Sequence, residues 1–276
     1  MTQEQRKETV ARPAATVMIV RQHEGEMEVF MVVRHHKIEF MGGALVFPGG
    51  KVDAQDGDAE LIAHATGVDD MDDQQRITRI AAIREAFEEC GVLLARHVGN
   101  THLVSGQDLE NLRQKYRNGI HAEEISMLDM VRNENLELAC DKLVHFAHWI
   151  PPAHVPKRFD TMFFLAEAPA EPGADHDGHE SVDSVWIKPS QALADGDAGQ
   201  RLVVFPTRMN LTKLARSNSV GDALEAATEH NVVTVQPRVI DKPDGKYLCI
   251  PEEADYGLVE IRMDKLPGYP QVPAAK

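Results

Sequence analysis

The sequence predicts an α/β fold, and three observations support this prediction. Short runs rich in β-branched and aromatic residues, near the N-terminus and between residues 142 and 187, have the length and composition of strands. Between them, from about Ile77 to Leu94, apolar side chains recur at helical spacing. Beyond residue 201, two more segments have the pattern of amphipathic helices. Strands and helices are therefore interspersed along the chain, which favours a sheet packed against helices.

The N-terminal segments predict a hairpin followed by a third strand. The runs ATVMIV and EVFMVVR are separated by the polar stretch RQHEGEM, which is typical of a turn between two strands. GALVF predicts the third strand, and we expect Pro48, Gly49 and Gly50 to end it as a turn. The Asp- and Gly-rich residues 53–75 are interpreted as an inserted loop with one helical turn.

The remaining elements are predicted from shorter patterns. Amphipathic stretches near 107–118 and 122–134 carry no chemical signature, and we interpret them as helices of a packing insertion. Strands are expected at KLVHFAHWI, DTMFFLAEA and DSVWI, followed by a helix at KPSQALAD. The C-terminal region predicts helices at PTRMNLTKLARS and VGDALEAATEH, a strand at VVTVQPRVI and a Pro-rich tail.

Composition limits the partners and the compartment. The 276 residues carry a formal charge of −15, which argues against binding to a nucleic acid backbone but allows a small phosphorylated substrate held through cations. Cys90, Cys140 and Cys249 are widely spaced and form no metal-binding pair, which favours a reducing compartment. No run of 18 apolar residues occurs. We therefore expect a cytoplasmic protein with no membrane partner, and a homodimer is left open.

The helix predicted around residue 85 carries an acidic face. At 100° per residue, Glu85, Glu88 and Glu89 share one side, opposite the apolar residues. Like charges at this spacing repel by a few tenths of a kcal/mol per pair unless a cation sits on them. Mg²⁺ or Mn²⁺ would suit such carboxylates. The alternative is an acidic face that is simply solvated.

The order of residues resembles a known family. REAFEECGV fits the pattern R-E-U-x-E-E-x-G-U, where U is an aliphatic or small apolar residue, and FPGGKVD precedes it. This combination is similar to the signature of the Nudix hydrolases, which cleave nucleoside diphosphates linked to another moiety. The resemblance implies an α/β/α sandwich with a mixed sheet. Gly91 can supply the close turn that ends the helix.

The spacing departs from the family pattern. That pattern places its glycine fourteen residues before the arginine, whereas Gly50 and Arg84 are 34 apart, so about twenty residues are inserted. Loop closure costs only about 0.6 kcal/mol per doubling of length, so we expect turn and helix to adjoin in one site. The box's first glutamate lies eight residues before the arginine, and counting back from Arg84 finds Arg76 rather than an acid.

One branch of the family, the coenzyme A diphosphatase-like proteins, is similar over nearly the full chain. The similarity lies in FPGGKVD with its long insertion, in IAAIREAFEECGVLLAR, in HWIPPAHVPKRFDTMFFLA and in the helical C-terminal extension. It implies a Nudix domain over 12–200, with insertions near 53–76 and 105–140, and an extension over 201–276. The implied reaction converts coenzyme A or acyl-coenzyme A into 3′,5′-ADP and a phosphopantetheine. Alternatives are hydrolysis of an ADP-sugar or dinucleoside polyphosphate, or a Nudix fold retained for ligand sensing.

The resemblance also implies roles for particular residues. Glu85 and Glu89 are expected as principal metal ligands, with Glu88 in support, and the Gly50 carbonyl as a further ligand. Arg84 is expected to orient these acids.

The remaining expectations concern the substrate and the base. Cations on or beside the segments that should approach the site are candidates for substrate phosphates: Arg34, Lys51 and Arg158. Glu180, in a polar loop before Trp186, is expected to act as the base or as a further metal ligand. Asp177 and Asp183 are alternatives to Glu180.

Overall fold

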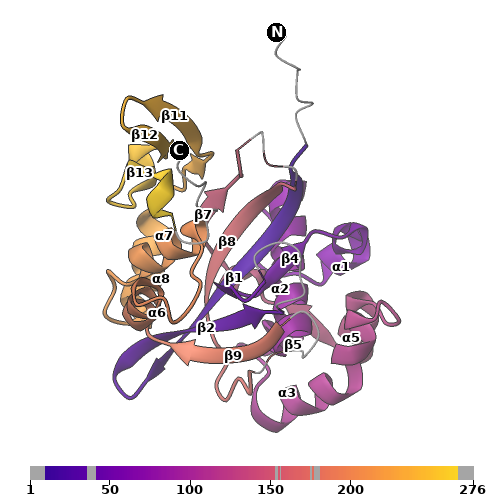
Figure 1. Cartoon of the computed structure of the whole chain (residues 1–276). Helices are drawn as coiled ribbons and strands as arrows, with labels where there is room; N and C mark the ends of the chain where they lie inside the picture. Colours follow the sequence, from indigo (N-terminus) through magenta and orange to yellow (C-terminus); the bar gives the residue numbers. More distant parts are fainter. Residues whose placement is uncertain are drawn as a thin grey trace.

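A mixed sheet covered by helices on both faces forms the centre of the protein (Figure 1). The computed structural model describes residues 10–35, 42–152, 155, 157–174, 176 and 181–266. The strands of the central sheet are β1 Arg12–His23, β2 Glu26–Arg34, β3 Leu45–Val46, β4 Gly49–Lys51, β7 Val144–Trp149, β8 Phe159–Glu167, β9 Ser181–Ile187 and β10 Thr234–Val235. The path through the sheet is β10-β7-β8-β1-β2-β3, and β4 pairs with β1 while β9 pairs with β2. β1 runs parallel to β8 and antiparallel to β2, which confirms the mixed sheet.

Strands β1 and β2 separate along their length, and the FPGG segment fills the gap. β1 pairs with β2 only from Val20 to His23, whereas its residues Ala14–Thr16 pair with β4. β3 pairs with the far end of β2. The chain therefore crosses from one separated strand to the other between Val46 and Gly49. The side chains around this crossing lie close to the acidic helix, as described below.

The expectation that Pro48, Gly49 and Gly50 form a turn is wrong. Gly49–Lys51 is itself a strand, and Gly49 has φ 154°, a conformation that favours glycine. A Cβ at Gly49 would lie 2.3 Å from the carbonyl oxygen of Ala15. The glycine therefore lets two backbones approach closely, which turn propensity alone does not reveal.

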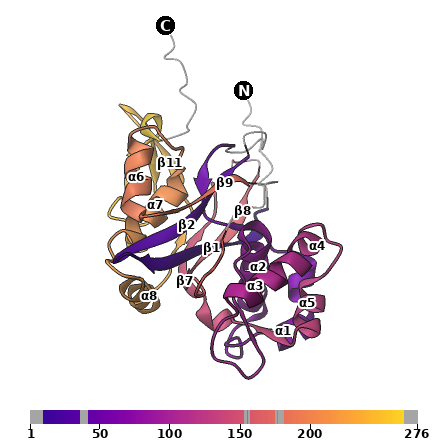
Figure 2. The ribbon, with the colours of Figure 1, turned by 90° about the horizontal axis from the view of Figure 1, so that it is seen from below.

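Each face of the sheet has its own hydrophobic core. Alternate residues of β1 point to opposite faces, so Val17 and Ile19 pack on one side while Met18 and Val20 pack on the other. The first core contains helix α2, Asp73–Cys90, and the helical insertions. The second contains the helices and strands that follow residue 187. Figure 2 shows the sheet between these two layers, which confirms the α/β/α sandwich.

Helix α2 has defined signals at both ends. Asp72 accepts a hydrogen bond from the backbone of Gln75, whose side chain accepts one from the backbone of Asp72 in return. The helix therefore begins at Asp73, four residues before its predicted start. Gly91 has φ 68° and ends the helix as predicted.

The insertions contain more structure than the sequence predicts. The helices are α1 Ala59–Ala63, α3 Gly106–Leu112, α4 Asn118–His121 and α5 Met127–Asn133. The predicted helices near 107–118 and 122–134 are confirmed, and a short π-helical segment, Arg113–Arg117, joins α3 to α4. A two-stranded sheet, β5 Ala95–His97 with β6 Leu136–Leu138, is not predicted, because strands of this length show no periodicity.

The C-terminal region is partly as predicted. Helices α6 Pro189–Asp197, α7 Phe205–Leu214 and α8 Val220–Glu229 are confirmed. VVTVQPRVI is broken into β10 and β11 at Pro237, which has no amide hydrogen for a ladder. The three-stranded sheet of β11 Arg238–Lys242, β12 Gly245–Cys249 and β13 Glu260–Arg262 is a further element that the sequence does not reveal. In the described ranges no helix is both long and apolar enough to cross a bilayer.

His145 of β7 should make stability depend on pH. Burial, reinforced by the positive charges of Arg79 and His148, lowers the pKa of His145 to about 4. Its Nε2 is buried, with no hydrogen-bond partner among the described residues. The unfolded chain therefore takes up a proton at a higher pH than the folded protein does. Stability due to neutral His145 is complete above the unfolded pKa of about 6.5 and is lost as the pH falls toward 4.

We expect His145→Leu to lose less stability than the wild type between pH 7 and pH 4. Each unit of difference between folded and unfolded pKa contributes about 1.4 kcal/mol. Urea unfolding of both proteins across this range measures the difference. Parallel curves would show that His145 does not carry this pH dependence.

Candidate active site

Helix α2 places its three glutamates side by side near the glycine strand β4. Glu85, Glu88 and Glu89 are all largely buried, and Glu89 is 8% exposed. The apolar side of the helix packs into the first core through residues such as Ile80, which leaves the acids on the side that faces β4. The structure therefore does not support a fully solvated acidic face.

Arg84 is the centre of a buried ionic cluster. It is 2% exposed, and its Nε and Nη2 donate to the two carboxylate oxygens of Asp56 at 2.7 and 3.0 Å. Its Nη1 donates to Glu85 at 3.0 Å and to Glu88 at 3.1 Å. Nη2 also donates to the carbonyl oxygen of Lys51 at 2.9 Å. One guanidinium thus ties the helix acids to the glycine strand and to the loop that follows it.

Asp56 is a site residue that the sequence analysis missed. It is 0% exposed and lies in a 3₁₀ turn, Ala54–Gly57, directly after the glycine strand. A usable signal was present, because the family pattern has its first glutamate six residues after the glycine, and six residues after Gly50 is Asp56. Counting back from Arg84 failed because the inserted residues lie between Asp56 and Arg84. Asp56 therefore has the spacing from the glycine that the family pattern gives its first glutamate, and the inserted residues separate it from the helix in the sequence.

The electrostatics of the cluster follow from burial and proximity. Burial alone would lower the pKa of Arg84, but its hydrogen bonds to Asp56 and the charges of Glu85, Asp56 and Glu88 outweigh this effect and raise it. Burial raises the pKa of Glu88, although Arg84 beside it acts in the opposite direction. Burial therefore disfavours the charged form of Glu88, and a bound cation would stabilise that form.

The glycine strand and the helix adjoin, as expected from the sequence. The backbone N–H of Gly49 donates to Glu89 at 2.8 Å, across 40 positions of sequence. A Cβ at Gly50 would lie 2.5 Å from the carboxylate of Glu85, so a side chain at this position would displace the acid. The long insertion leaves this contact intact.

The helical insertion is more than packing, which corrects the interpretation from sequence. Arg117 donates to the carbonyl oxygens of Glu88 and Glu89, at 2.9 and 2.8 Å, and so satisfies the last turn of α2. His121, the last residue of α4, and Glu123, two residues beyond it, line the same cavity as the three glutamates. Glu123 has φ 58°, a conformation that is uncommon for a residue with a side chain. The insertion thus forms one wall of the candidate site.

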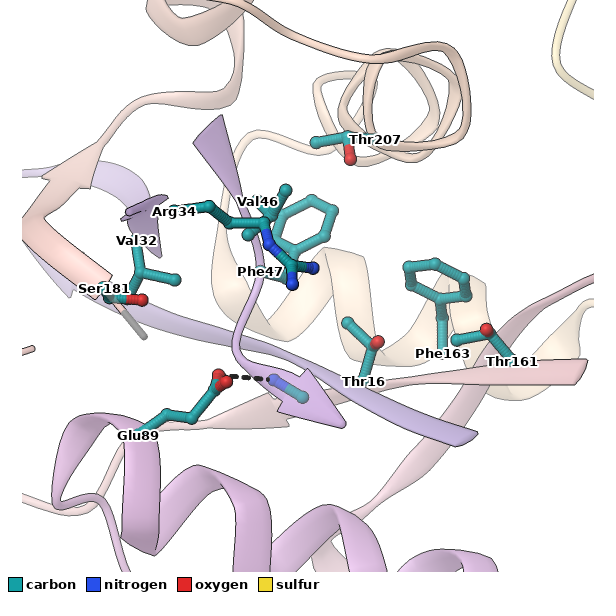
Figure 3. A pocket seen from close by; sticks show the side chains of 11 residues that line it. Thr16, Val32, Arg34, Val46, Phe47, Glu89, Thr161, Phe163, Ser181 and Thr207 are labelled. Atoms are coloured by element: carbon teal, nitrogen blue, oxygen red, sulfur yellow. Dashed lines mark hydrogen bonds between the residues drawn. The ribbon is translucent and has the colours of Figure 1, made fainter. Parts of the chain in front are cut away.

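Two adjoining cavities surround the glycine strand. The larger, of about 330 Å³, is lined by the α2 acids, Arg84, His121, Glu123 and residues of β1, β4 and β8. The smaller, of about 160 Å³, lies between the separated strands and helix α7 (Figure 3). The two cavities share five lining residues: Thr16, Arg34, Gly49, Glu89 and Thr161.

The structure does not bring all the expected substrate-binding residues together. Arg34 lines both cavities, and Lys51 lines the larger one. Arg158 lines neither; its side chain donates to the carbonyl oxygen of Pro151 at 3.0 Å. Its sequence position beside β8 did not reveal where the side chain points.

The expected loop acids are placed only in part. Glu180 and Asp177 lie outside the described residues. Asp183 is exposed on β9 and lines neither cavity.

The donor set suits a hard divalent cation, although the side chains are not arranged around one. The three α2 carboxylates and the backbone of Gly50 border one cavity, and Mg²⁺ and Mn²⁺ prefer such oxygen ligands. Within the described part of the chain, no three acidic, histidine or cysteine side chains converge closely enough to hold an ion. Glu85 and Glu88 instead face Arg84, so binding of an ion would require them to turn toward it.

Comparison with known proteins places this geometry in a family. The model of the NUDT19 Nudix domain matches residues 66–214, more than half of the chain. The chain is 31% identical over 190 residues to "Putative nudix hydrolase 7" of Caenorhabditis elegans and 26% identical over 228 residues to "Acyl-coenzyme A diphosphatase NUDT19" of Xenopus laevis. Each match covers 68% of this chain, but the chain spans only 56% and 60% of these relatives.

A solved structure agrees with this assignment. The crystal structure of a Nudix hydrolase from Alicyclobacillus acidocaldarius superimposes with a TM-score of 0.64 at 25% identity, over 79% of this chain and 97% of that one. The family model, the relatives and the shared fold lead to one conclusion: this chain belongs to the Nudix hydrolase family and resembles its coenzyme A diphosphatase-like branch.

Proposed function

We propose that the protein is a metal-dependent diphosphatase that cleaves coenzyme A or acyl-coenzyme A into 3′,5′-ADP and phosphopantetheine or its acyl derivative. The observation that carries this proposal is that three glutamates of α2 line one cavity beside the glycine strand, two of them bonded to Arg84 and the third, Glu89, to the backbone of Gly49. The printed name of the Xenopus laevis relative supports the choice of substrate. A module that only binds a ligand would have no need to bury three like charges on one helix.

The proposed metal is Mg²⁺ or Mn²⁺, since Nudix hydrolases generally use divalent ions. Glu85 and Glu89 would hold it as principal ligands, with Glu88 and the Gly50 carbonyl in support. A bound cation would neutralise the diphosphate and acidify an attacking water. Arg84 keeps the acids in place through its hydrogen bonds to Glu85 and Glu88.

Cations in the cavities would orient the substrate. Arg34 and Lys51 are well placed to bind substrate phosphates, because Lys51 lines the larger cavity and Arg34 lines both. Arg158 lines neither cavity, so its proposed contact would involve a part of the substrate outside them. We also propose a reducing, cytoplasmic setting. It fits the buried thiols of Cys90 and Cys140, because burial raises the pKa of each to about 12 and leaves them protonated.

We propose Glu180 as the base that deprotonates the attacking water, and Glu123 is its competitor. The sequence around Glu180 predicts a polar loop, and a carboxylate in a loop can move toward the reacting atoms when substrate binds. Glu123 lines the larger cavity together with the α2 acids. Glu180→Gln is expected to lower kcat and to alter the acidic limb of the pH–rate profile.

Parallel profiles for Glu123→Gln and Asp183→Asn test this choice of base. If the acidic limb of the pH–rate profile is unchanged in Glu180→Gln but altered in Glu123→Gln, the base is Glu123 of the helical insertion and not Glu180.

A substrate panel tests the proposed function. The purified protein with Mg²⁺ would be given coenzyme A, acetyl-coenzyme A, ADP-ribose and diadenosine polyphosphates, and kcat/KM measured for each. We expect coenzyme A or its acyl derivative to have the highest value. A clear preference for ADP-ribose or a dinucleoside polyphosphate would contradict the proposed substrate and leave the hydrolase chemistry in place.

A further inference from the structure

One nitrogen of the Arg34 guanidinium, in the lining of the smaller cavity, has no hydrogen-bond partner among the described residues. This nitrogen, Nε, is buried. A buried guanidinium nitrogen without a partner costs stability, so such groups are normally satisfied by protein, water or ligand. Figure 3 shows the guanidinium projecting from the end of β2 into the space below Thr207. The side chain is therefore presented to whatever occupies this cavity.

The backbone fixes this orientation. Pairing of β2 with β9 shifts register between Val33 and Arg34, so that Arg34 pairs with Ser181. Such irregularities re-aim side chains and are common next to active sites. The Arg34 side chain therefore lies where the two cavities adjoin, and not in solvent beyond the end of β2.

The other groups around the cavity also suit an anion. Hydroxyl groups of Thr16, Thr161 and Thr207 line it and can donate hydrogen bonds. Thr207 belongs to the first turn of α7, a ten-residue helix whose N-terminus carries no side-chain cap. That end of a helix carries partial positive charge. Glu89 is the one acidic side chain among the lining residues, and its carboxylate accepts the N–H of Gly49.

The size of the cavity suits a small anionic group. At about 160 Å³ it is close to the volume of about 150 Å³ that holds a single benzene ring. A phosphate monoester fits this space and would give Arg34 an anionic partner, which a purine base would not. Because the two cavities share Arg34, Gly49 and Glu89, an occupant of the smaller one lies next to the site of the proposed cleavage.

We propose that the cavity lined by Arg34, Thr161 and Thr207 is a subsite for a phosphate monoester of the substrate, separate from the diphosphate that is cleaved. This inference rests on the proposed function and specifies its substrate class as nucleoside 3′,5′-bisphosphate derivatives. Both phosphate positions lie on one ribose ring, so the two groups can occupy adjoining cavities at once. The extension beyond residue 201 supplies Thr207 and thereby takes part in substrate selection.

Kinetic discrimination tests the subsite. The ratio of kcat/KM for coenzyme A to that for dephospho-coenzyme A, which lacks the 3′-phosphate, is expected to be about tenfold or more in the wild type. Arg34→Gln should bring the ratio close to one, and Arg34→Lys should restore part of it because the charge returns. Thr207→Val should lower it less. Lys51→Gln, in the larger cavity only, should slow both substrates and leave the ratio unchanged.

A binding measurement separates failure of the subsite from failure of the proposed function. Calorimetry without metal would compare 3′,5′-ADP with 5′-AMP, and we expect tighter binding of 3′,5′-ADP in the wild type but not in Arg34→Gln. If this holds while coenzyme A is not hydrolysed, the subsite stands and the proposed reaction fails. If coenzyme A is hydrolysed but Arg34→Gln keeps the wild-type ratio, the subsite is overturned. Circular dichroism confirms that each variant is folded.

Discussion

Replacing Glu89 by glutamine is expected to lower kcat for coenzyme A by at least about 10², the scale of losing a principal electrostatic group. Glutamine keeps the shape of the side chain and an oxygen that can accept the N–H of Gly49, now bonded at 2.8 Å. The contact between helix and glycine strand should therefore survive. What is lost is the negative charge that the proposed metal ion requires from its ligand. Steady-state kinetics with saturating Mg²⁺ measure the effect.

A matched control comes from the same helix. Asp73 has a side chain that is 88% exposed at the start of α2, far along the helix from Glu89. Asp73→Asn removes one negative charge without touching either cavity, so its kcat should stay near that of the wild type. A Glu89→Gln enzyme as fast as the Asp73→Asn control would refute the role assigned to Glu89.

Replacing Asp56 by alanine should have the largest effect on stability. Breaking a buried ion pair by removing one partner typically costs about 3–5 kcal/mol, because it leaves a buried charge without its compensation. Asp56 is 0% exposed and Arg84 2%, and the pair is joined by two hydrogen bonds. Urea unfolding without metal should therefore show a lower free energy of unfolding. Activity should fall too, because Arg84 also holds Glu85 and Glu88.

An exposed ion pair in the same region provides the comparison. Glu60 and Arg132 bridge α1 to α5 with both side chains about half exposed. Pairs of this kind contribute about 0–1 kcal/mol, so Glu60→Ala should be mild. Similar losses for Glu60→Ala and Asp56→Ala would contradict the importance that we give to the buried cluster.

The parts of the fold that the sequence predicts are those governed by local rules. Helix α2 is recognisable from its apolar spacing and from Gly91, which ends it by adopting a left-handed conformation. The hairpin of β1 and β2 is recognisable because polar residues separate two β-branched runs. The acids of α2 share a face simply because a helix repeats every 3.6 residues.

Other features depend on contacts between distant segments. β4 is a strand because its glycines pair with β1, and nothing within FPGG itself indicates this. Asp56 could have been found by counting forward from Gly50, whereas Arg117, His121 and Thr207 reach the site only through the packing of the helical insertion and of α7. Tertiary placement of this kind leaves no periodic signal in a single sequence.

Incubation of the purified protein with coenzyme A and Mg²⁺, with products identified by mass spectrometry, tests the central claim most directly. We expect 3′,5′-ADP and phosphopantetheine to appear in equal amounts, and EDTA to abolish both. Folded protein that releases neither product with Mg²⁺ or Mn²⁺, or that releases both at full rate in EDTA, would contradict the proposed metal-dependent cleavage of the diphosphate bond.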